Sequence, residues 1–350
     1  MQAFKHSSRG TTIAGVTKKQ LRELPFPLAP LPEQHRIVAV IEELFSDLDA
    51  GVAALKRVQT NLKRYRASVL KAACEGRLVP TEAELAREEG RAYEPADVLL
   101  KRILAERRAR WEAEHPGKKY VEPAMPEAAG LPELPEGWCW ARMEQLIADF
   151  RSGSTVVPHD KPTDFPILRS SSVRPMTIDY SDIRFLDQHD SLSLPNFLRV
   201  GDLLFTRLSG SLEYVGNCAL VDNVEAASIQ YPDRIFRAQL TESDCGPFVE
   251  IFFSSPVART QIKALAKSTA GHQRISMGAI SGHLIPLPPL PEQRRIVAEV
   301  ERRLSVVSEM EATVAANLAR AGRLRQAVLK RAFEGQLVAQ EPVGVFGSAR

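Results

Sequence analysis

The residues Leu-Pro-Glu-Gln-His-Arg-Ile-Val-Ala at positions 31–39 recur as Leu-Pro-Glu-Gln-Arg-Arg-Ile-Val-Ala at positions 290–298, an offset of 259. Between 31–79 and 290–338 no gap is needed, and 21 of 49 positions are identical. Repetition at a fixed offset indicates two copies of one structural element. The chain is therefore organised around this repeat, and the sequence between the copies is of a different kind.

Each copy is predicted to form one long helix. Pro32 and Pro291 stand in the first turn, where a residue without an N–H is tolerated. Gly76 and Gly335 follow the last apolar positions and are typical of a helix stop. More than forty residues, each rising 1.5 Å, give a rod of about 65 Å.

Apolar residues recur along both copies at alternating spacings of four and three residues, which is typical of a coiled coil. The stripe of the second copy is weaker because Arg303 and Asn317 fall within it. A narrow apolar stripe needs a second helix to cover it, and the other copy, in the same chain or in a second one, is the expected partner. The residues expected to make these coiled-coil and partner contacts are Ile37, Leu44, Leu48, Leu55, Leu62, Val307, Val314 and Leu324.

The two copies divide the chain into six expected segments. Pro-Leu-Ala-Pro at 27–30 matches Pro-Leu-Pro-Pro at 286–289, so the residues before the first copy are expected to end a domain that lies mostly outside this sequence. Thr81 with Glu84 predicts a capping box, and Pro95 opens a second connector helix. The segments are a domain remnant 1–28, long helices 29–80 and 289–340, a helical connector with a Pro-rich linker 81–130, a globular domain 131–288 and a flexible tail 341–350.

Residues 131–288 predict a separate globular domain, which makes the fold class α+β. Trp138 and Trp140 open this domain and are expected to anchor its core. One helix is expected from Phe248 to about Lys267. Strand-like runs separated by turn residues lie at 165–169, 202–207, 218–221 and 234–238.

Composition and motifs exclude several classes of protein. With 44% hydrophobic and 25% charged residues, the 350-residue chain can build a core. No apolar run approaches the ~20 residues of a membrane span. The four cysteines are scattered and are expected to be reduced thiols, in neither a disulfide nor a zinc site. Because phosphate-loop, dinucleotide, metalloprotease, nuclease and methyltransferase motifs are missing and the histidines are dispersed, no catalytic residue and no metal site are expected.

The distribution of charge is more informative than the net charge of +3. Residues 131–288 hold 14 Lys and Arg against 18 Asp and Glu, yet residues 254–288 hold four basic residues and no acid. Basic, hydroxyl and amide side chains suit phosphates and base edges, although each such loop alone is equally consistent with an ordinary solvated loop. The residues expected to contact DNA are Arg207, Ser209, Lys267, Ser268, Thr269, His272, Gln273, Arg274, Arg169 and Ser170.

The repeated motif resembles the conserved regions of Type I restriction–modification specificity subunits. Leu-Pro-Glu-Gly-Trp at 134–138 resembles the opening of that family's target recognition domain, and Val-Gly-Asp-Leu-Leu-Phe-Thr-Arg at 200–207 resembles its middle. The resemblance covers nearly the whole chain. It implies a non-catalytic, cytoplasmic subunit in which long antiparallel helices hold recognition domains on the two halves of a split DNA site.

The resemblance also implies partners. These are double-stranded DNA, modification subunits that use S-adenosylmethionine, and a restriction subunit that uses ATP and Mg²⁺; this chain itself is expected to bind no cofactor. With one complete recognition domain, the chain resembles a half-subunit or an N-terminally truncated form, and a homodimer through the long helices would restore two domains. The alternatives are a remnant that only docks on partner subunits without binding DNA and, least favoured, an independent nuclease or methylase.

Overall fold

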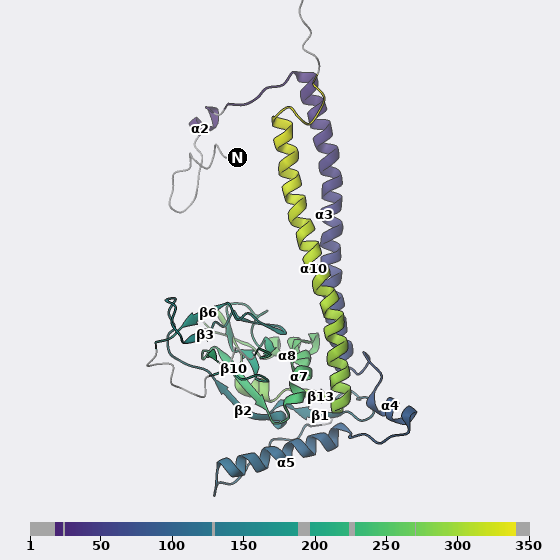
Figure 1. The fold of residues 1–350 in the computed structure, drawn as a ribbon, viewed down its shortest axis with the longest axis vertical. Helices are drawn as coiled ribbons and strands as arrows, with labels where there is room; N and C mark the ends of the chain where they lie inside the picture. Colours follow the sequence, from purple (N-terminus) through teal and green to yellow (C-terminus); the bar gives the residue numbers. More distant parts are fainter. Residues whose placement is uncertain are drawn as a thin grey trace, which may run out of the picture. The chain divides into compact units, whose positions relative to one another are not determined.

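The computed structural model describes residues 18–23, 25–127, 130–187, 197–223, 228–269 and 271–340 (Figure 1). The chain divides into two compact units. Unit 1 comprises Met1–Asn61 and Met310–Arg350, and unit 2 comprises Leu62–Glu309. Most of the expected remnant 1–28 and the whole tail 341–350 lie outside the described residues.

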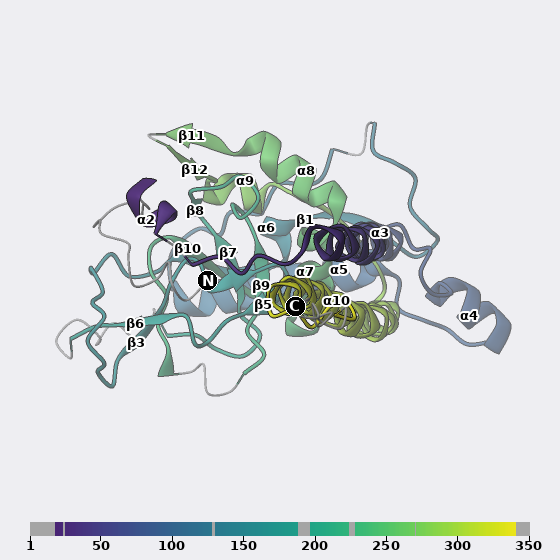
Figure 2. The same cartoon turned by 90° about the horizontal axis from the view of Figure 1, so that it is seen from above.

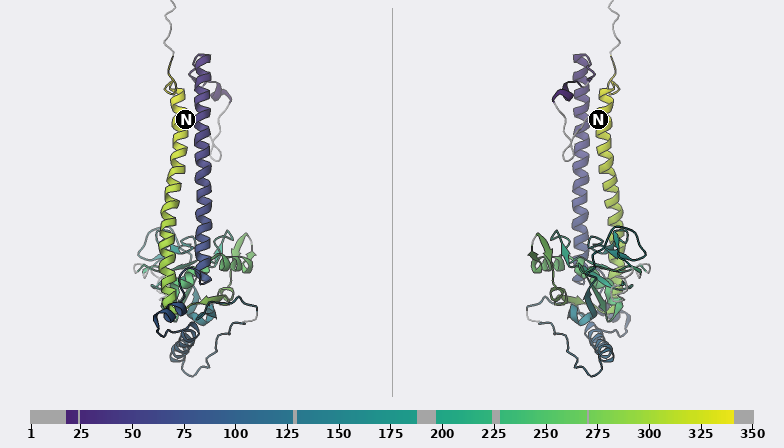
Figure 3. Two further views of the ribbon diagram at one scale, coloured as in Figure 1. Left: turned by 90° about the vertical axis from the view of Figure 1, so that its right-hand side faces the viewer. Right: turned by 90° about the vertical axis from the view of Figure 1, so that its left-hand side faces the viewer.

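The two sequence copies form two helices of equal length. Helix α3 spans Leu31–Cys74 and helix α10 spans Leu290–Phe333, so both have 44 residues and both ends differ by the offset of 259. Each is a single uninterrupted helix (Figure 3). Gly76 and Gly335 have φ of 64° and 67°, and the residue after each glycine donates its N–H to the carbonyl five residues back. The predicted helices and their glycine stops are confirmed.

Unit 1 contains the first part of α3 and the last part of α10, which run antiparallel. Arg325 of α10 contacts Asp49 of α3 with 3.1 Å between Nη2 and Oδ2, and its guanidinium lies 4.5 Å from the ring centroid of Phe45. The short helix α2, Lys18–Arg22, precedes α3. In unit 2 the same two helices are in contact, and Arg66 of α3 donates to Ser308 of α10 across 3.2 Å.

The apolar seam of the long helices differs in phase from the predicted one. Leu44 is 39% exposed and Leu324 is 51% exposed, so these two expected contact residues lie outside the seam. The inward position is one residue later, at Phe45 and at Leu304 instead of Arg303. On a helix, the residues three and four positions after a given residue lie on the same side as that residue. Leu44 and Phe45 follow Ile41 by three and four positions and are both apolar, so the sequence pattern fits a seam through either of them. Ile37 and Ile296, near the starts of the two helices, are half-buried and buried as predicted. The other positions predicted correctly as buried or half-buried recur every seven residues, at Ile41, Leu48, Leu55, Leu62, Val69, Val300, Val307, Val314, Ala321 and Val328.

Two connector helices follow α3 in unit 2. Helix α4, Glu82–Glu89, has the predicted capping box on Thr81 and ends at Gly90 with φ of 65°. Helix α5, Ala96–Glu114, begins after Pro95 and precedes the Pro116–Gly117 stop. Although α5 carries many charges, Leu99 and Ile103 are 0% and 1% exposed. One side of α5 is therefore part of a core, which the sequence did not indicate.

The 131–288 segment has the predicted α+β character, with small antiparallel sheets. The largest has the order β2-β10-β7-β9. Its strands are Ile147–Ser152, Ile235–Leu240, Leu203–Thr206 and Cys218–Leu220. The smaller sheets pair β1 (Cys139–Arg142) with β13 (Leu284–Leu287), β3 (Pro166–Leu168) with β6 (Ile183–Phe185), and β4 (Val173–Arg174) with β5 (Thr177–Ile178). The fifth sheet has three strands in the order β11-β12-β8, which are Lys267–Thr269, His272–Arg274 and Leu208–Ser209.

The helix predicted from Phe248 to about Lys267 is wrong, because it is two helices. Helix α7 spans Gly246–Ser254 and helix α8 spans Pro256–Leu265. Between them Ser255 is extended, with ψ of 153°, since a residue before proline avoids the helical region. The remaining short helices are α6 (Met143–Leu146), α9 (Met277–Ser281) and the 3₁₀ helix Ser243–Cys245.

The core of unit 2 is shared between the 131–288 segment and the helices around it. Leu70 of α3, Leu99 of α5 and Ile296 of α10 belong to one buried cluster with Phe248 and Phe253 of α7. The segment is therefore not a self-contained domain, in contrast to the sequence prediction. The four cysteines are free thiols, as predicted, and no helix among the described residues is long and apolar enough to cross a membrane.

Candidate nucleic-acid interface

The three-stranded sheet β11-β12-β8 brings together most of the predicted DNA-contacting residues. In one row of the sheet Ser268, Gln273 and Ser209 are cross-strand neighbours. In the next row Lys267, Arg274 and Leu208 are neighbours. Figure 2 shows β11 and β12 beyond the end of α8, with β8 on the same side of the segment. Segments about 60 residues apart in sequence thus form one small surface.

A cavity of about 660 Å³ lies beside this sheet. Three cationic side chains line it, those of Arg207, Lys267 and Arg274, together with the hydroxyl residues Ser152 and Ser276. Its apolar lining comes from Phe236, Leu265, Ile275 and Met277, with Gly278 completing the wall. No carboxylate lines it, so the cavity presents positive charge.

Arg207 is held in a defined position at the edge of this cavity. Its Nη1 donates to the main-chain oxygen of Asp233 across 3.1 Å and lies 3.6 Å from that residue's carboxylate. Its guanidinium lies 5.6 Å from the ring centroid of Phe236 in β10. These contacts reduce the rotameric freedom that Arg207 would lose on binding an anion.

A second polar cavity, of about 300 Å³, contains the other predicted residues. Arg169 and Ser170 line it, with Arg184 and Arg234, which the sequence did not single out. Asp233 also lines this cavity and contacts Arg207 of the first, so the two cavities flank one ion pair. Arg234 was missed because it begins the strand-like run 234–238, which was not considered as a binding surface, and Arg184 was missed because strand β6 was not predicted. The sequence signal that could have identified Arg234 is a basic residue at the end of a strand-like run.

The acid-free stretch 254–288 is not uniformly available to a ligand. Lys263 pairs with Glu213 across 2.6 Å, and Arg259 donates to the main-chain oxygen of Glu213 across 3.0 Å. Burial lowers the pKa of Arg259, as expected for a cation placed among apolar groups. The side chains of Lys267 and Arg274 instead face the first cavity. Half of the basic residues in this stretch therefore have structural contacts.

Two further predicted residues are placed less directly. Thr269 pairs with His272 across β11 and β12, so both belong to the same sheet. His272 is exposed, whereas the side chain of Thr269 lies outside the described part of the chain. His272 is not among the residues that line the cationic cavity.

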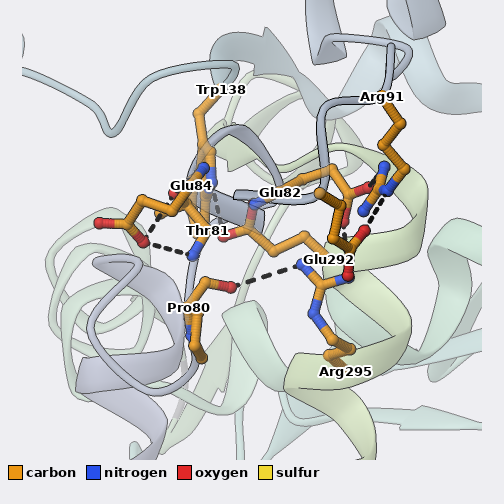
Figure 4. Close-up of polar contacts among 9 residues, drawn as sticks. Pro80, Thr81, Glu82, Glu84, Arg91, Trp138, Glu292 and Arg295 are labelled. Atoms are coloured by element: carbon orange, nitrogen blue, oxygen red, sulfur yellow. Dashed lines mark hydrogen bonds and ion pairs between the residues drawn. The ribbon is translucent and has the colours of Figure 1, made fainter. Parts of the chain in front are cut away.

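A buried polar cluster fixes the 131–288 segment to the start of α10 (Figure 4). Glu292, which is 0% exposed, accepts a hydrogen bond from Trp138 Nε1 across 2.9 Å and another from the main-chain N–H of Glu82 across 2.8 Å. Glu82, 1% exposed, pairs with Arg91 and Arg295, each across 2.6 Å. The cluster joins the connector, the segment and the repeated motif.

The two carboxylates of this cluster are affected differently by their surroundings. Burial raises the pKa of Glu292 above its ordinary value, although the two donated hydrogen bonds act in the opposite direction. Burial also acts to raise the pKa of Glu82, but hydrogen bonds from Arg295 and Arg91 outweigh it and the pKa is lowered. Glu82 therefore forms the ion pairs of the cluster and Glu292 accepts its buried hydrogen bonds, so both carboxylates have structural contacts.

Comparison with known proteins agrees with this architecture. Residues 1–56 match the family model described as the Type I restriction modification DNA specificity domain. The chain is 32% identical over 333 residues to the EcoKI specificity subunit of Escherichia coli K12, covering 95% of this chain and 62% of the relative. It is 25% identical over 345 residues to the EcoBI specificity subunit of Escherichia coli, covering 97% of this chain and 64% of the relative.

A solved structure is also similar in fold. It belongs to a study of complex assembly and conformational transition in the type I R-M system and aligns with a TM-score of 0.54 at 22% identity, covering 96% of this chain and 68% of that one. In sequence and in fold, this chain is therefore similar to the Type I restriction–modification specificity subunits. It spans less than two thirds of the length of the two curated relatives described above.

Proposed function

We propose that this chain is the DNA-specificity subunit of a Type I restriction–modification complex. In this role the 131–288 segment binds duplex DNA and directs modification and restriction subunits to a split site. The observation that carries the proposal is the gathering of Arg207, Lys267 and Arg274 around one acid-free cavity beside a polar three-stranded sheet. Cations that contact phosphates beside polar groups that reach base edges are the usual means of DNA recognition.

The proposed role is recognition without catalysis. The relatives are named specificity subunits, and enzyme motifs are missing from this sequence. We place S-adenosylmethionine on the modification subunits, and ATP with Mg²⁺ on the restriction subunit. Because the proposed partner is the DNA of the cell, the complex would work in the cytoplasm.

A groove in unit 1 favours the hypothesis that the assembly contains a second recognition domain. It has a volume of about 600 Å³ and an apolar lining that includes Ile37, Ile41, Leu329 and Phe333. The repeat relates Phe26 and Leu28, which are 68% and 78% exposed, to Ile285 and Leu287 of β13, which are both 0% exposed. In unit 2 the equivalent positions are thus covered by the recognition segment and its neighbours.

We propose that a second copy of the chain, associated through the long helices, brings the second recognition domain. Light scattering of the purified chain should then give the mass of a dimer. Phe333→Asp, which places a charge in the groove, should weaken the dimer, whereas Val121→Asp, at an exposed connector position, should not. A monomer at all concentrations would contradict the homodimer but not the DNA-binding role.

The experiment that tests the function is reconstitution with the modification subunits. Methylated positions are then mapped across genomic DNA, and the modification subunits without this chain provide the control. The proposal expects methylation at one defined split sequence that depends on the chain. Assembly without any sequence preference would instead support the alternative, a subunit that only docks on its partners.

A further inference from the structure

We propose that the cavity bounded by Arg207, Lys267 and Arg274 binds a DNA backbone phosphate, while the Ser209–Gln273–Ser268 row of the adjoining sheet contacts base edges. This inference rests on the proposed function and assigns separate tasks to residues that the sequence grouped together. In particular, Gln273 and Arg274 are adjacent in β12, so their side chains point to opposite faces of the sheet.

Charge argues that the cavity takes an anion. Lys267 and Arg274 are direct cross-strand neighbours, an arrangement that destabilises a sheet when the charges are alike. Within the described part of the chain neither side chain makes a hydrogen bond or an ion pair, although Lys263 nearby has a carboxylate partner. The guanidinium of Arg207 faces the same space as a third cation. A bound phosphate would relieve the repulsion between Lys267 and Arg274, and Arg207, although paired with Asp233, can still donate to it.

Geometry assigns different contributions to the three cations. Arg207 is held by Asp233 and Phe236, so it presents its donors in a fixed direction. Arg274 offers the planar fork that suits a phosphate, whereas Lys267 offers a point charge on a flexible stem. The cavity, at about 660 Å³, has room for a phosphate together with part of the adjoining sugars.

The other face of the sheet has the chemistry of base recognition. Ser268, Gln273 and Ser209 share one row, and none of the three lines the cationic cavity. Gln273 Nε2 donates a long hydrogen bond of 3.4 Å to Ser268 Oγ, and this contact orients the amide. A glutamine amide can pair with the N6 and N7 positions of adenine, and serine hydroxyls can donate or accept.

The test compares matched variants of the full chain in the reconstituted complex. Lys267→Gln and Arg274→Gln each remove one proposed phosphate contact, and Lys263→Gln removes the same charge from a residue outside the cavity. Gln273→Ala and Ser209→Ala alter the proposed base-contacting row. For each variant, affinity for a cognate and a random duplex of 30 base pairs is measured from 50 to 200 mM salt, and the methylated sequences are mapped.

The two cavity variants should weaken binding to both duplexes and lower the salt slope by about one unit each, with the recognised sequence unchanged. Lys263→Gln should leave the slope as in the wild type. Gln273→Ala should relax the sequence at one position and keep the slope. The inference would be overturned if the wild type is site-selective but Lys267→Gln and Arg274→Gln leave the salt slope unchanged. It would also be overturned if Arg274→Gln changes the recognised DNA sequence. A wild type without any site preference would overturn the proposed function itself.

Discussion

Trp138 donates its indole Nε1–H to Glu292 across 2.9 Å, which bonds the first tryptophan of the 131–288 segment to the repeated motif at the start of α10. Glu33 occupies the equivalent place in the first copy of the repeat and accepts no hydrogen bond from the residues that the structure describes. One motif thus serves two environments, a buried junction in unit 2 and an open helix start in unit 1. The difference permits matched pairs of substitutions.

Glu292→Ala is expected to destabilise the chain by about 2–4 kcal/mol. It leaves the indole N–H of Trp138 and the main-chain N–H of Glu82 buried without an acceptor, at about 1–3 kcal/mol each, partly offset by the loss of a buried carboxylate. Glu33→Ala should change the free energy of unfolding by less than about 0.5 kcal/mol. Urea unfolding monitored by tryptophan fluorescence compares them, and equal effects would contradict the structural role of the junction.

The helix seam gives a second matched pair. Leu62 is 8% exposed and Leu44 is 39% exposed, although the sequence pattern placed both in the seam. Leu62→Asp buries an unpaired charge and should cost several kcal/mol. Leu44→Asp should cost less than about 1 kcal/mol. Thermal unfolding followed by circular dichroism decides between the two phases, since the predicted phase would make both substitutions equally damaging.

These pairs indicate which features the sequence could predict. The repeat gave both helices with their ends, because proline and glycine act locally on the backbone. The phase of the seam was not predictable, since Leu44 and Phe45 are both apolar and packing of the second helix selects Phe45. The hairpin β11–β12 was also missed, because strands of three polar residues lack an alternating apolar pattern. Its residues were nevertheless identified by charge.

The substitution Leu99→Ala tests whether α5 and the 131–288 segment share one hydrophobic core. This side chain is 0% exposed and belongs to the same buried cluster as Phe248, so its truncation should cost about 2–5 kcal/mol. The neighbouring Val98 is 44% exposed, and Val98→Ala should be nearly neutral. An isolated 131–288 fragment should correspondingly bind a hydrophobic dye. A fragment as stable as the full chain, with Leu99→Ala neutral, would restore the separate domain predicted from the sequence.

A pH dependence is expected from Glu250 in α7. Burial raises the pKa of this carboxyl from 4.5 to about 7, and the nearby carboxylates of Asp222 and Glu301 contribute in the same direction. Because the folded state binds the proton more tightly, stability should fall as pH rises from about 4.5 to 7 and then level off, by at most about 3 kcal/mol. Glu250→Gln, whose amide oxygen can still accept from the Leu220 N–H, should remove this slope and stabilise the chain at pH 8. Urea midpoints at pH 5 and pH 8 measure the effect, and an unchanged slope in the variant would assign it to other groups.

The glycine stops of the two long helices provide the last pair. Gly76 and Gly335 both have positive φ, so alanine at either position should cost about 1–2 kcal/mol from the backbone alone. At Gly76 an added Cβ would lie 2.5 Å from Cγ of Pro135 and 3.2 Å from Cζ2 of Trp138, at the packed junction of the 131–288 segment. At Gly335 it would meet the end of the flexible Gln340 side chain, at 2.7 Å from Nε2, which can move away.

Gly76→Ala should therefore cost about 1–3 kcal/mol more than Gly335→Ala, because a well-packed junction resists an inserted methyl group. The shared backbone conformation cancels in the comparison, so the difference in unfolding free energy measures the packing of the 131–288 segment against the end of α3. If the two alanine variants unfold at the same urea concentration, the end of α3 is not packed against Pro135 and Trp138 in solution. A larger loss at Gly76 would show that one repeated sequence ends in two different environments, one of which is packed against the 131–288 segment.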